Sequence, residues 1–354
     1  MSSFPASVTV KRCLVIVAVL ALVLGVAVGC GGGGGGASGE VTLRLTHQWP
    51  KATPEKGDFR AVIAERFKEE VEKQTDGQVK IEISPNASLV EPTEQYDSIT
   101  QQATDMSVFP MDYAAGNVPA FSITLMPAMV RNHAQAQNYQ DAEIGGEIEK
   151  LAEDNDVKIL TWIWNAGAVG VRKGDPITSP DDVKKGNTTR AAGVRVEEML
   201  ESIGFGISSM PSSEIYNGMQ TGTLDSAITS ASSFSSYRLY EQVDSYTSPT
   251  ENTFWFMFEP LIIGTQQFEE LTPEQQDIVE KAGQDLQEYA YTASEEDDQR
   301  VEEEFEKNDV EVVTINDADF EKWQEVSEPV WDSFAKDVDG GQRMIDLAKE
   351  VPAE

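Results

Sequence analysis

The stretch NTTRAAGVRVEEML, residues 187–200, predicts a strand, a turn of small residues and a helix in direct succession. The strand ends near Arg190, and two alanines and a glycine follow it. Apolar residues recur at helical spacing from Val196 to Ile203, and Gly204 is suited to cap the helix C-terminus. A strand followed at once by a helix is the unit of α/β folds with a mostly parallel sheet.

The same alternation extends in both directions from this stretch. Downstream, GISSMP and TLDSAIT predict strands on either side of the helix SSEIYNGMQTG. Upstream, VTLRLTHQW, QVKIEIS and DMSVF predict strands, and a helix is expected from Phe59 to Val71. We therefore expect an α/β protein with two lobes, each built on its own set of strands.

Four longer segments are also interpretable. VKILTWIW, residues 157–164, predicts one continuous strand that is buried on both faces. Residues 134–154 predict one helix, and a capping box at Thr272 opens a helical pattern that continues to about residue 307. Apolar residues over 320–334 predict a final helix.

The composition excludes some partners. The 354 residues include 61 acidic and 27 basic ones, a formal net charge of −34, and a hydrophobic content of 40% that is sufficient for packed cores. Nucleic acid is not expected to bind, because its recognition requires clustered lysine and arginine. The acidity fits either a saline habitat or the solvated surface of an exported protein.

The N-terminal segment has the features of an export signal. Basic residues precede the apolar run CLVIVAVLALVLGVAV, which ends in VAVGC at Cys30. VAVGC resembles a bacterial lipobox, although Ala27 occupies a position where leucine is commoner. We predict a signal peptide over 1–30, lipidation of Cys30 and a flexible glycine-rich tether over 31–39. The alternative is an uncleaved membrane anchor.

Residues suited to catalysis are few. The chain has two histidines, His47 and His133, and its two cysteines, Cys13 and Cys30, both lie in the N-terminal segment. No HExxH or GxSxG motif occurs, and we expect no disulfide, cysteine nucleophile or metal site in the folded part. A site centred on His47 remains an alternative.

Arg190 is the strongest candidate for a binding residue. It lies at the carboxyl end of a predicted parallel strand, where open α/β sheets bind ligands. A guanidinium offers a rigid fork of donors that matches a carboxylate. The alternative is a structural ion pair with Glu214 or Asp225. Arg195, beside the apolar face of its own helix, is expected to be solvated.

Aromatic residues near the predicted strand ends give a second signal. Taken singly, each is more typical of a core, but together they could form the apolar wall of a ligand cleft. They are Trp49, Tyr113, Trp162, Trp164, Phe254 and Trp255.

Around Arg190 the chain resembles a known family. TTRAAG, MPSSEIYNGMQTGTLDSA and YRLYE are similar to the extracytoplasmic solute receptors of TRAP transporters, the DctP-like family, in which a strand ending in arginine precedes PxSEVYxALQxGxVDG. THQWP, FKEEVEKQTDGQVKIEISP, ATDMSV and FEELTPEQQDIVEKA are also similar to family segments. The likeness covers roughly residues 40–335.

This resemblance implies a two-lobed, periplasmic-binding-protein-like α/β fold with strands crossing between the lobes and a long bracing helix. It places lobe 1 mainly in 40–160 and lobe 2 mainly in 161–250. Residues 251–354 would supply crossover strands, the long helix and C-terminal helices that pack on both lobes. The implied protein is extracytoplasmic, and the lipobox-like sequence at Cys30 would anchor it by lipid to the cell membrane. It would catalyse no reaction, need no cofactor or metal, and deliver a small organic carboxylate to membrane permease subunits.

The resemblance also suggests site residues. Arg190 falls on the arginine that pairs with the substrate carboxylate in this family. Other positions at or near the family pocket, together with one residue from the aromatic pattern, are Gln48, Trp49, Glu91, Tyr113, Trp164, Ser212, Thr229 and Trp255.

Two departures from the family bear on the ligand. Some members have a second arginine where this chain reads NAGAVG, with Ala168 near that place and Arg172 out of register. The polar QExN stretch of many members is replaced by SAITSASS. We therefore predict a monocarboxylate with an apolar or aromatic body.

Three other functions remain open on the sequence alone. The chain could be a solute receptor that serves another transporter or a sensor kinase. It could be an exported enzyme that acts on a small carboxylate, or a surface adhesion or structural lipoprotein without a small ligand.

Overall fold

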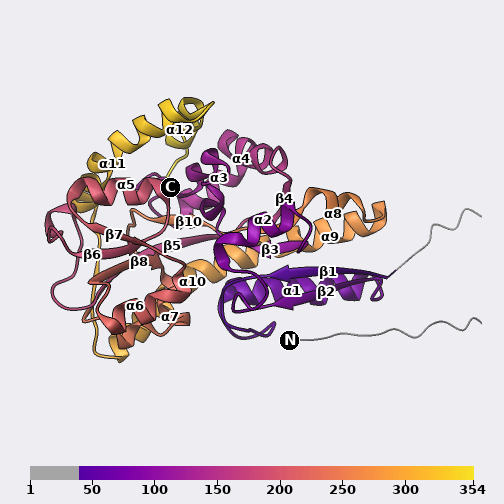
Figure 1. Cartoon of the computed structure of the whole chain (residues 1–354), viewed down its shortest axis with the longest axis horizontal. Coiled ribbons are helices and arrows are strands. Elements are labelled where there is room, and N and C mark those ends of the chain that lie inside the picture. The colour runs from indigo at the N-terminus through magenta and orange to yellow at the C-terminus, as the bar shows by residue number, and fades with distance from the viewer. Residues whose placement is uncertain (1–39) are drawn as a thin grey trace, which may run out of the picture. The chain divides into compact units, whose positions relative to one another are not determined.

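The computed structural model describes residues 40–354 and arranges their strands in two sheets (Figure 1). We call the parts built on these sheets the first and the second lobe. The predicted signal peptide, the lipobox Cys30 and the tether over 31–39 lie outside the described residues. Among the helices of residues 40–354, none combines the length and the apolar character that a membrane crossing requires.

The first lobe contains a five-stranded sheet with the order β2-β1-β3-β11-β4. β1 pairs in parallel with β2 and β3, whereas β11 is antiparallel to β3 and β4. The alternation expected of VTLRLT is confirmed, because Leu43 and Leu45 are buried in one core with the apolar face of α1 (Phe59–Gln74). The strands are β1 (Val41–Thr46), β2 (Val79–Ser84), β3 (Met106–Val108), β4 (Val157–Thr161) and β11 (Leu261–Gly264).

The second lobe contains a seven-stranded sheet with the order β12-β9-β5-β8-β6-β7, and β10 pairs with β5. β6 is parallel to both β7 and β8, as the strand–helix–strand pattern predicted. The helix after β6 is α5 (Val194–Ile203), and Gly204 ends it in a left-handed conformation, as expected. The strands are β5 (Trp164–Val171), β6 (Thr188–Ala191), β7 (Gly206–Ser209), β8 (Ser226–Ser230), β9 (Ser245–Ser248), β10 (Phe256–Phe258) and β12 (Glu311–Thr314).

The prediction of one strand over 157–164 was wrong. β4 ends at Thr161 in the first sheet, and β5 begins at Trp164 in the second. Between them, the backbone N–H of Trp162 donates to the side chain of Gln287 at 2.9 Å, and the Gln287 amide donates to the Trp162 carbonyl at 2.8 Å. A distant side chain thus replaces the sheet partners of this residue, and the chain crosses from one lobe to the other.

Two predicted helices are each divided in the structure. Residues 134–154 form α3 (His133–Asp141) and α4 (Glu143–Glu153), separated by the extended backbone of Ala142. The capping box at Thr272 is confirmed, but the pattern to residue 307 forms α9 (Pro273–Asp285) and α10 (Gln287–Lys307). α10 contacts α1 in the first lobe and β5, β9 and β12 in the second, so it is the bracing helix.

The predicted C-terminal helix is α11 (Asp317–Asp337), which packs against α5 and α12. It buries Phe320, Trp323, Val330, Trp331 and Phe334, as its apolar spacing indicated. The remaining α-helices are α2 (Gln95–Thr100), α6 (Ile215–Thr221), α7 (Ala231–Ser236), α8 (Thr265–Glu269) and α12 (Gly341–Lys349). Within residues 40–354 the short 3-10 helices are η1 (Pro92–Glu94), η2 (Met111–Ala114), η3 (Pro119–Leu125), η4 (Pro180–Asp182), η5 (Ser212–Glu214) and η6 (Leu239–Glu241).

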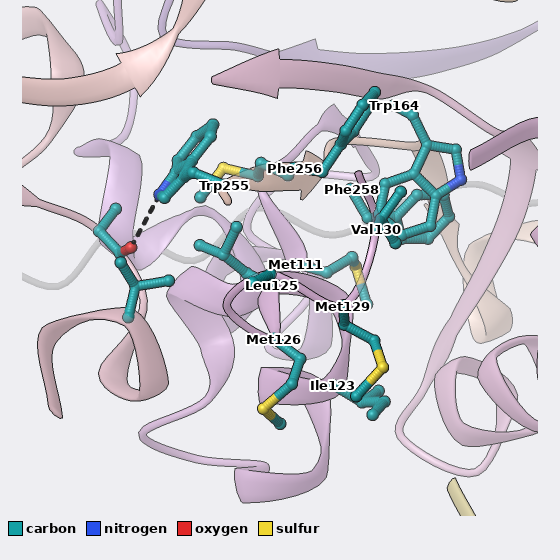
Figure 2. Close-up of a cluster of buried hydrophobic side chains, with 14 of the residues drawn as sticks. Met111, Ile123, Leu125, Met126, Met129, Val130, Trp164, Trp255, Phe256 and Phe258 are labelled. Carbon is teal, nitrogen blue, oxygen red and sulfur yellow. Dashed lines mark hydrogen bonds between the residues drawn. The ribbon is translucent and has the colours of Figure 1, made fainter. Parts of the chain in front are cut away.

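A large core cluster lies where η2 and η3 meet the crossing strands β5 and β10 (Figure 2). Methionine and aliphatic side chains from residues 111–130 pack with the aromatic residues of β5 and β10. The ring centroids of Trp164 and Phe258 are 4.8 Å apart. At another part of the cluster, the Trp255 indole N–H donates to the Ala192 carbonyl at 3.2 Å. This contact holds the turn after β6 against the residues that directly precede β10.

Candidate functional site

Arg190 lies in β6, and the protein surrounds it almost completely. Its exposed fraction is 1%. Nε donates to the Met210 carbonyl at 2.9 Å, and one Nη donates to the Ile228 carbonyl at 2.9 Å. The other Nη donates to the Tyr113 hydroxyl at 3.1 Å. Met210 and Ile228 belong to the second lobe, whereas Tyr113 follows β3 of the first, so Arg190 lies between the lobes.

Within residues 40–354, no carboxylate forms an ion pair with Arg190. The two carboxylates considered as alternative partners of Arg190 do not contact it. Asp225 accepts from the backbone N–H of Thr188 at 2.8 Å, and Glu214 is exposed. The structural ion pair considered for Arg190 is therefore not formed. Since an isolated buried charge is unfavourable, this guanidinium is suited to receive an external anion.

A second pair of predicted residues also joins the lobes. Gln48, directly after β1, is 3% exposed and accepts from the Ser212 hydroxyl at 3.3 Å. The Tyr237 hydroxyl donates to the Gln48 carbonyl at 3.1 Å. Thr229 follows Ile228, one of the acceptors of the arginine, along β8. The structure thus brings Gln48, Ser212 and Thr229 close to the surroundings of the arginine.

A cavity of about 330 Å³ lies beside these residues. Two hydrogen-bond acceptors of Arg190, Tyr113 and Met210, are part of its wall. Segments of the first lobe and the turns after β6 and β7 complete the wall. The lining residues are Thr93, Asp112, Tyr113, Gly116, Ala192, Gly193, Val194, Glu197, Ser209, Met210 and Pro211.

Of the nine predicted site residues, Tyr113 alone lines this cavity, and Arg190 lies behind its wall. Four of the others have different surroundings. Trp49 is fully buried, with the Arg60 guanidinium 4.1 Å from its ring centroid. Trp164 and Trp255 belong to the core cluster of Figure 2. Glu91 is exposed just before η1. The predicted aromatic wall is therefore reduced to Tyr113 at the cavity, because the tryptophans pack with other side chains.

Sequence reasoning missed two acidic residues on the cavity wall, Asp112 and Glu197. Burial, with the nearby Glu197, raises the pKa of Asp112 to about 7, although Arg195 acts in the opposite direction. Burial also raises the pKa of Glu197, against the effects of Ser209 and Arg190. The position of Asp112 next to Tyr113 was the only sequence signal, and in a chain with 61 acidic residues it was too weak.

The expectation that Arg195 is solvated was wrong. Its exposed fraction is 8%, and it donates to Glu198 at 2.9 Å and to the Ser333 hydroxyl at 3.1 Å. Asp337 of α11 lies 3.6 Å from it. Helix α11 packs over α5 and covers this side chain, which the helical spacing of α5 alone could not indicate.

Sequence reasoning also missed the fully buried Arg60. It pairs with Asp58 and with Glu259, each at 2.7 Å, and donates to the Ser230 hydroxyl at 2.9 Å. Burial opposes the charge, but the two carboxylates raise the pKa of Arg60 above its ordinary value. Unlike Arg190, this arginine is neutralised within the protein, so its role is structural.

The surroundings of His47 differ from those expected of a catalytic base. Its exposed fraction is 1%, and burial lowers its pKa to about 4. Its Nδ1 has no hydrogen-bond partner among residues 40–354, and its ring centroid lies 6.0 Å from that of Trp49. In the described part of the chain, no cluster of three His, Cys, Asp or Glu side chains is arranged for a metal ion.

The carboxyl of Asp112 predicts a pH-dependent stability. Its pKa rises from the ordinary 3.8 to about 7 on folding, so the folded state binds the proton more tightly. The associated stability is present below pH 4 and is lost as the pH rises through 7. We expect the free energy of unfolding of Asp112→Asn, relative to the parent, to increase by about 3 kcal/mol from pH 5 to pH 8. Urea unfolding at both pH values measures this, and a pH-independent difference contradicts it.

Two sheets joined by crossing strands, with a buried arginine between the lobes, define a two-lobed periplasmic binding protein. Residues 45–337 match the family described as bacterial extracellular solute-binding protein, family 7, DctP, and the chain belongs to this family. The resemblance to TRAP solute receptors is thereby confirmed.

Individual relatives agree with this assignment. A solute-binding protein of Albidiferax ferrireducens is 34% identical over 310 residues, which are 87% of this chain and 91% of the relative. A TRAP periplasmic solute-binding protein from Rhodoferax ferrireducens, solved with bound malonate, superposes with a TM-score of 0.84 at 34% identity, covering 87% of this chain and 98% of that one. A TRAP periplasmic solute-binding protein from Sulfitobacter, solved with bound β-D-galacturonate, shares the fold, with a TM-score of 0.78 at 23% identity over 87% of this chain and 99% of that one.

Proposed function

We propose that this protein is the extracytoplasmic receptor of a TRAP-type transporter and binds a small organic carboxylate between its lobes. The observation that carries the proposal is Arg190, a buried guanidinium that has no carboxylate partner in residues 40–354 and adjoins a cavity of about 330 Å³. The malonate in the Rhodoferax relative, which is 34% identical, supports a carboxylate as the ligand.

The hydrogen bonds of Arg190 explain how a carboxylate would bind. A guanidinium has five N–H groups, one on Nε and two on each Nη. Three are used within the protein, one from each nitrogen. One N–H therefore remains on each Nη, and two such donors match the two oxygens of a carboxylate. Tyr113 orients one Nη and lines the cavity, so we propose that it positions the arginine and contacts the ligand.

The body of the ligand is less apolar in this proposal than the sequence suggested. Trp49, Trp164 and Trp255 lie in packed cores, and the apolar side chains at the cavity include Tyr113 and Met210. We retain a monocarboxylate, with a body that packs against these two side chains. Gln48, Ser212 and Thr229 are proposed to position the wall around the arginine.

Closure of the lobes would exclude water and strengthen the ion pair. Because a ligand shifts a conformational equilibrium only by its differential affinity, contacts from both lobes are needed to favour the closed state. Arg190 and Tyr113 provide them from opposite lobes. The closed receptor would deliver its ligand unchanged to membrane permease subunits, and lipidation of Cys30 would keep it at the extracytoplasmic membrane surface.

Thermal unfolding of the chain from residue 40 against a panel of organic acids, sugars and amino acids tests the proposal. We expect one class of carboxylate to stabilise the protein, by about 2.7 kcal/mol at a hundred times its dissociation constant. The protein should first be unfolded and refolded to remove any ligand from expression. Stabilisation by no acid in the panel would contradict a carboxylate receptor, whereas chemical conversion of the bound acid would indicate an enzyme.

A further inference from the structure

The cavity next to Arg190 has two carboxyl groups in its wall. Asp112 precedes Tyr113 in η2, and Glu197 lies one turn into α5. The exposed fraction of Asp112 is 4%, and its Oδ1 has no hydrogen-bond partner in the described part of the chain. A buried carboxyl oxygen without a partner is unfavourable unless a donor from outside reaches it.

The charged groups around these carboxyls do not neutralise them. Asp112 lies near Glu197 and near Arg195, but Arg195 pairs with Glu198 at 2.9 Å and approaches Asp337 at 3.6 Å. Glu197 lies near Arg190, Glu201 and Ser209. Among residues 40–354, no lysine, arginine or histidine is within ion-pair distance of either carboxyl. One wall thus combines a cation behind Tyr113 and Met210 with two acidic groups.

The turn after β6 lies beside both acidic groups at the wall of the cavity. Gly193 has φ of +100°, and a Cβ there would lie 2.6 Å from Leu125 Cδ2 and 3.4 Å from the Asp112 carboxyl. Any residue larger than glycine is disfavoured here, because the positive φ would strain its backbone and its Cβ would collide with Leu125. Because Gly193 has no side chain, the backbone of the turn lies close to the Asp112 carboxyl. This carboxyl therefore lies near the N-terminus of α5, the helix that contains Glu197.

On the basis of the proposed receptor function, we infer that the ligand is zwitterionic. Its carboxylate binds Arg190, and its protonated amine binds the carboxyls of Asp112 and Glu197. An ammonium group has three donors and a positive charge, so it can bond both carboxyls and offset their repulsion. A hydroxyl has one donor and no charge, and a second carboxylate on the ligand would be repelled. An amino acid is therefore the ligand class that fits this wall.

Calorimetry with matched pairs of ligands tests the inference. The pairs are leucine with 2-hydroxy-4-methylpentanoate, phenylalanine with phenyllactate, alanine with lactate, and 4-aminobutyrate with 4-hydroxybutyrate. We expect at least one amino acid to bind tenfold or more tightly than its hydroxy partner. In Asp112→Asn/Glu197→Gln this preference should fall to about one. Glu201→Gln, an exposed acid on the same helix, is the matched control and should retain it.

The pH dependence gives a second readout that a structural role of the carboxyls would not produce. An ammonium ligand needs ionised carboxyls, so amino-acid affinity should rise from pH 5.5 to pH 8, and this rise should be lost in Asp112→Asn/Glu197→Gln. Equal or tighter binding of the hydroxy acids, through Arg190, overturns the inference but leaves the receptor function intact. Failure of carboxylates of every kind to bind overturns both.

Discussion

Replacing Arg190 with alanine is expected to weaken carboxylate binding by roughly thirtyfold to several thousandfold. Truncation of one partner of a buried, hydrogen-bonded charge pair costs about 2–5 kcal/mol, and each 1.4 kcal/mol is a factor of ten. The large value is expected because the guanidinium is 1% exposed and no carboxylate of residues 40–354 forms an ion pair with it. Titration calorimetry with a carboxylate identified by thermal unfolding provides the measurement.

Two further variants distinguish lost binding from a damaged fold. Arg190→Lys retains the charge but not the two-pronged donor geometry, so its affinity should be intermediate. Arg172→Ala is the control, because Arg172 is a half-buried arginine of the second lobe that, like Arg190, donates to a backbone carbonyl, that of Leu224, at 3.1 Å. Circular dichroism should show all three variants folded. Unchanged affinity in folded Arg190→Ala would rule out the proposed role.

Parts of the fold could be predicted because they depend on local patterns. Alternation in VTLRLT, the capping box at Thr272 and the left-handed Gly204 are each encoded within a few residues, and each is present. The break between β4 and β5 is different, since it depends on Gln287, which bonds Trp162 from 125 residues away. The apolar pattern of residues 157–164 does not show at which residue the chain leaves the first sheet and enters the second.

The site was predictable to the extent that residue chemistry is distinctive. An arginine at the end of a strand is conspicuous in an acidic chain, but its contact with Tyr113 of the other lobe was not among the predictions. Tryptophans are equally suited to cores and to ligand walls, so Trp164 and Trp255 could not be assigned from type alone. Asp112 and Glu197 were hidden among 61 acidic residues, and only their burial on one cavity wall distinguishes them.

The cluster around Arg60 predicts the largest effect on stability. Replacing Arg60 with methionine, which fills much of the same space, is expected to reduce the free energy of unfolding by about 3–5 kcal/mol. The substitution leaves Asp58 and Glu259 buried without the cation that contacts both at 2.7 Å, and it removes the guanidinium from the face of Trp49. Chemical unfolding followed by tryptophan fluorescence measures the loss.

The sign of the pH dependence identifies the cause of that loss. Without Arg60, both carboxyls should have raised pKa values in the folded state, so stability is retained at low pH and lost as the pH rises. The deficit of Arg60→Met should therefore be smaller at pH 5 than at pH 8, and Asp58→Asn/Glu259→Gln in the same background should recover part of it. Lys281→Met, which removes an exposed pair with Asp285 at 2.8 Å, should cost no more than about 1 kcal/mol. A deficit in Arg60→Met that is equal at both pH values would mean that lost packing, rather than two uncompensated charges, destabilises the protein.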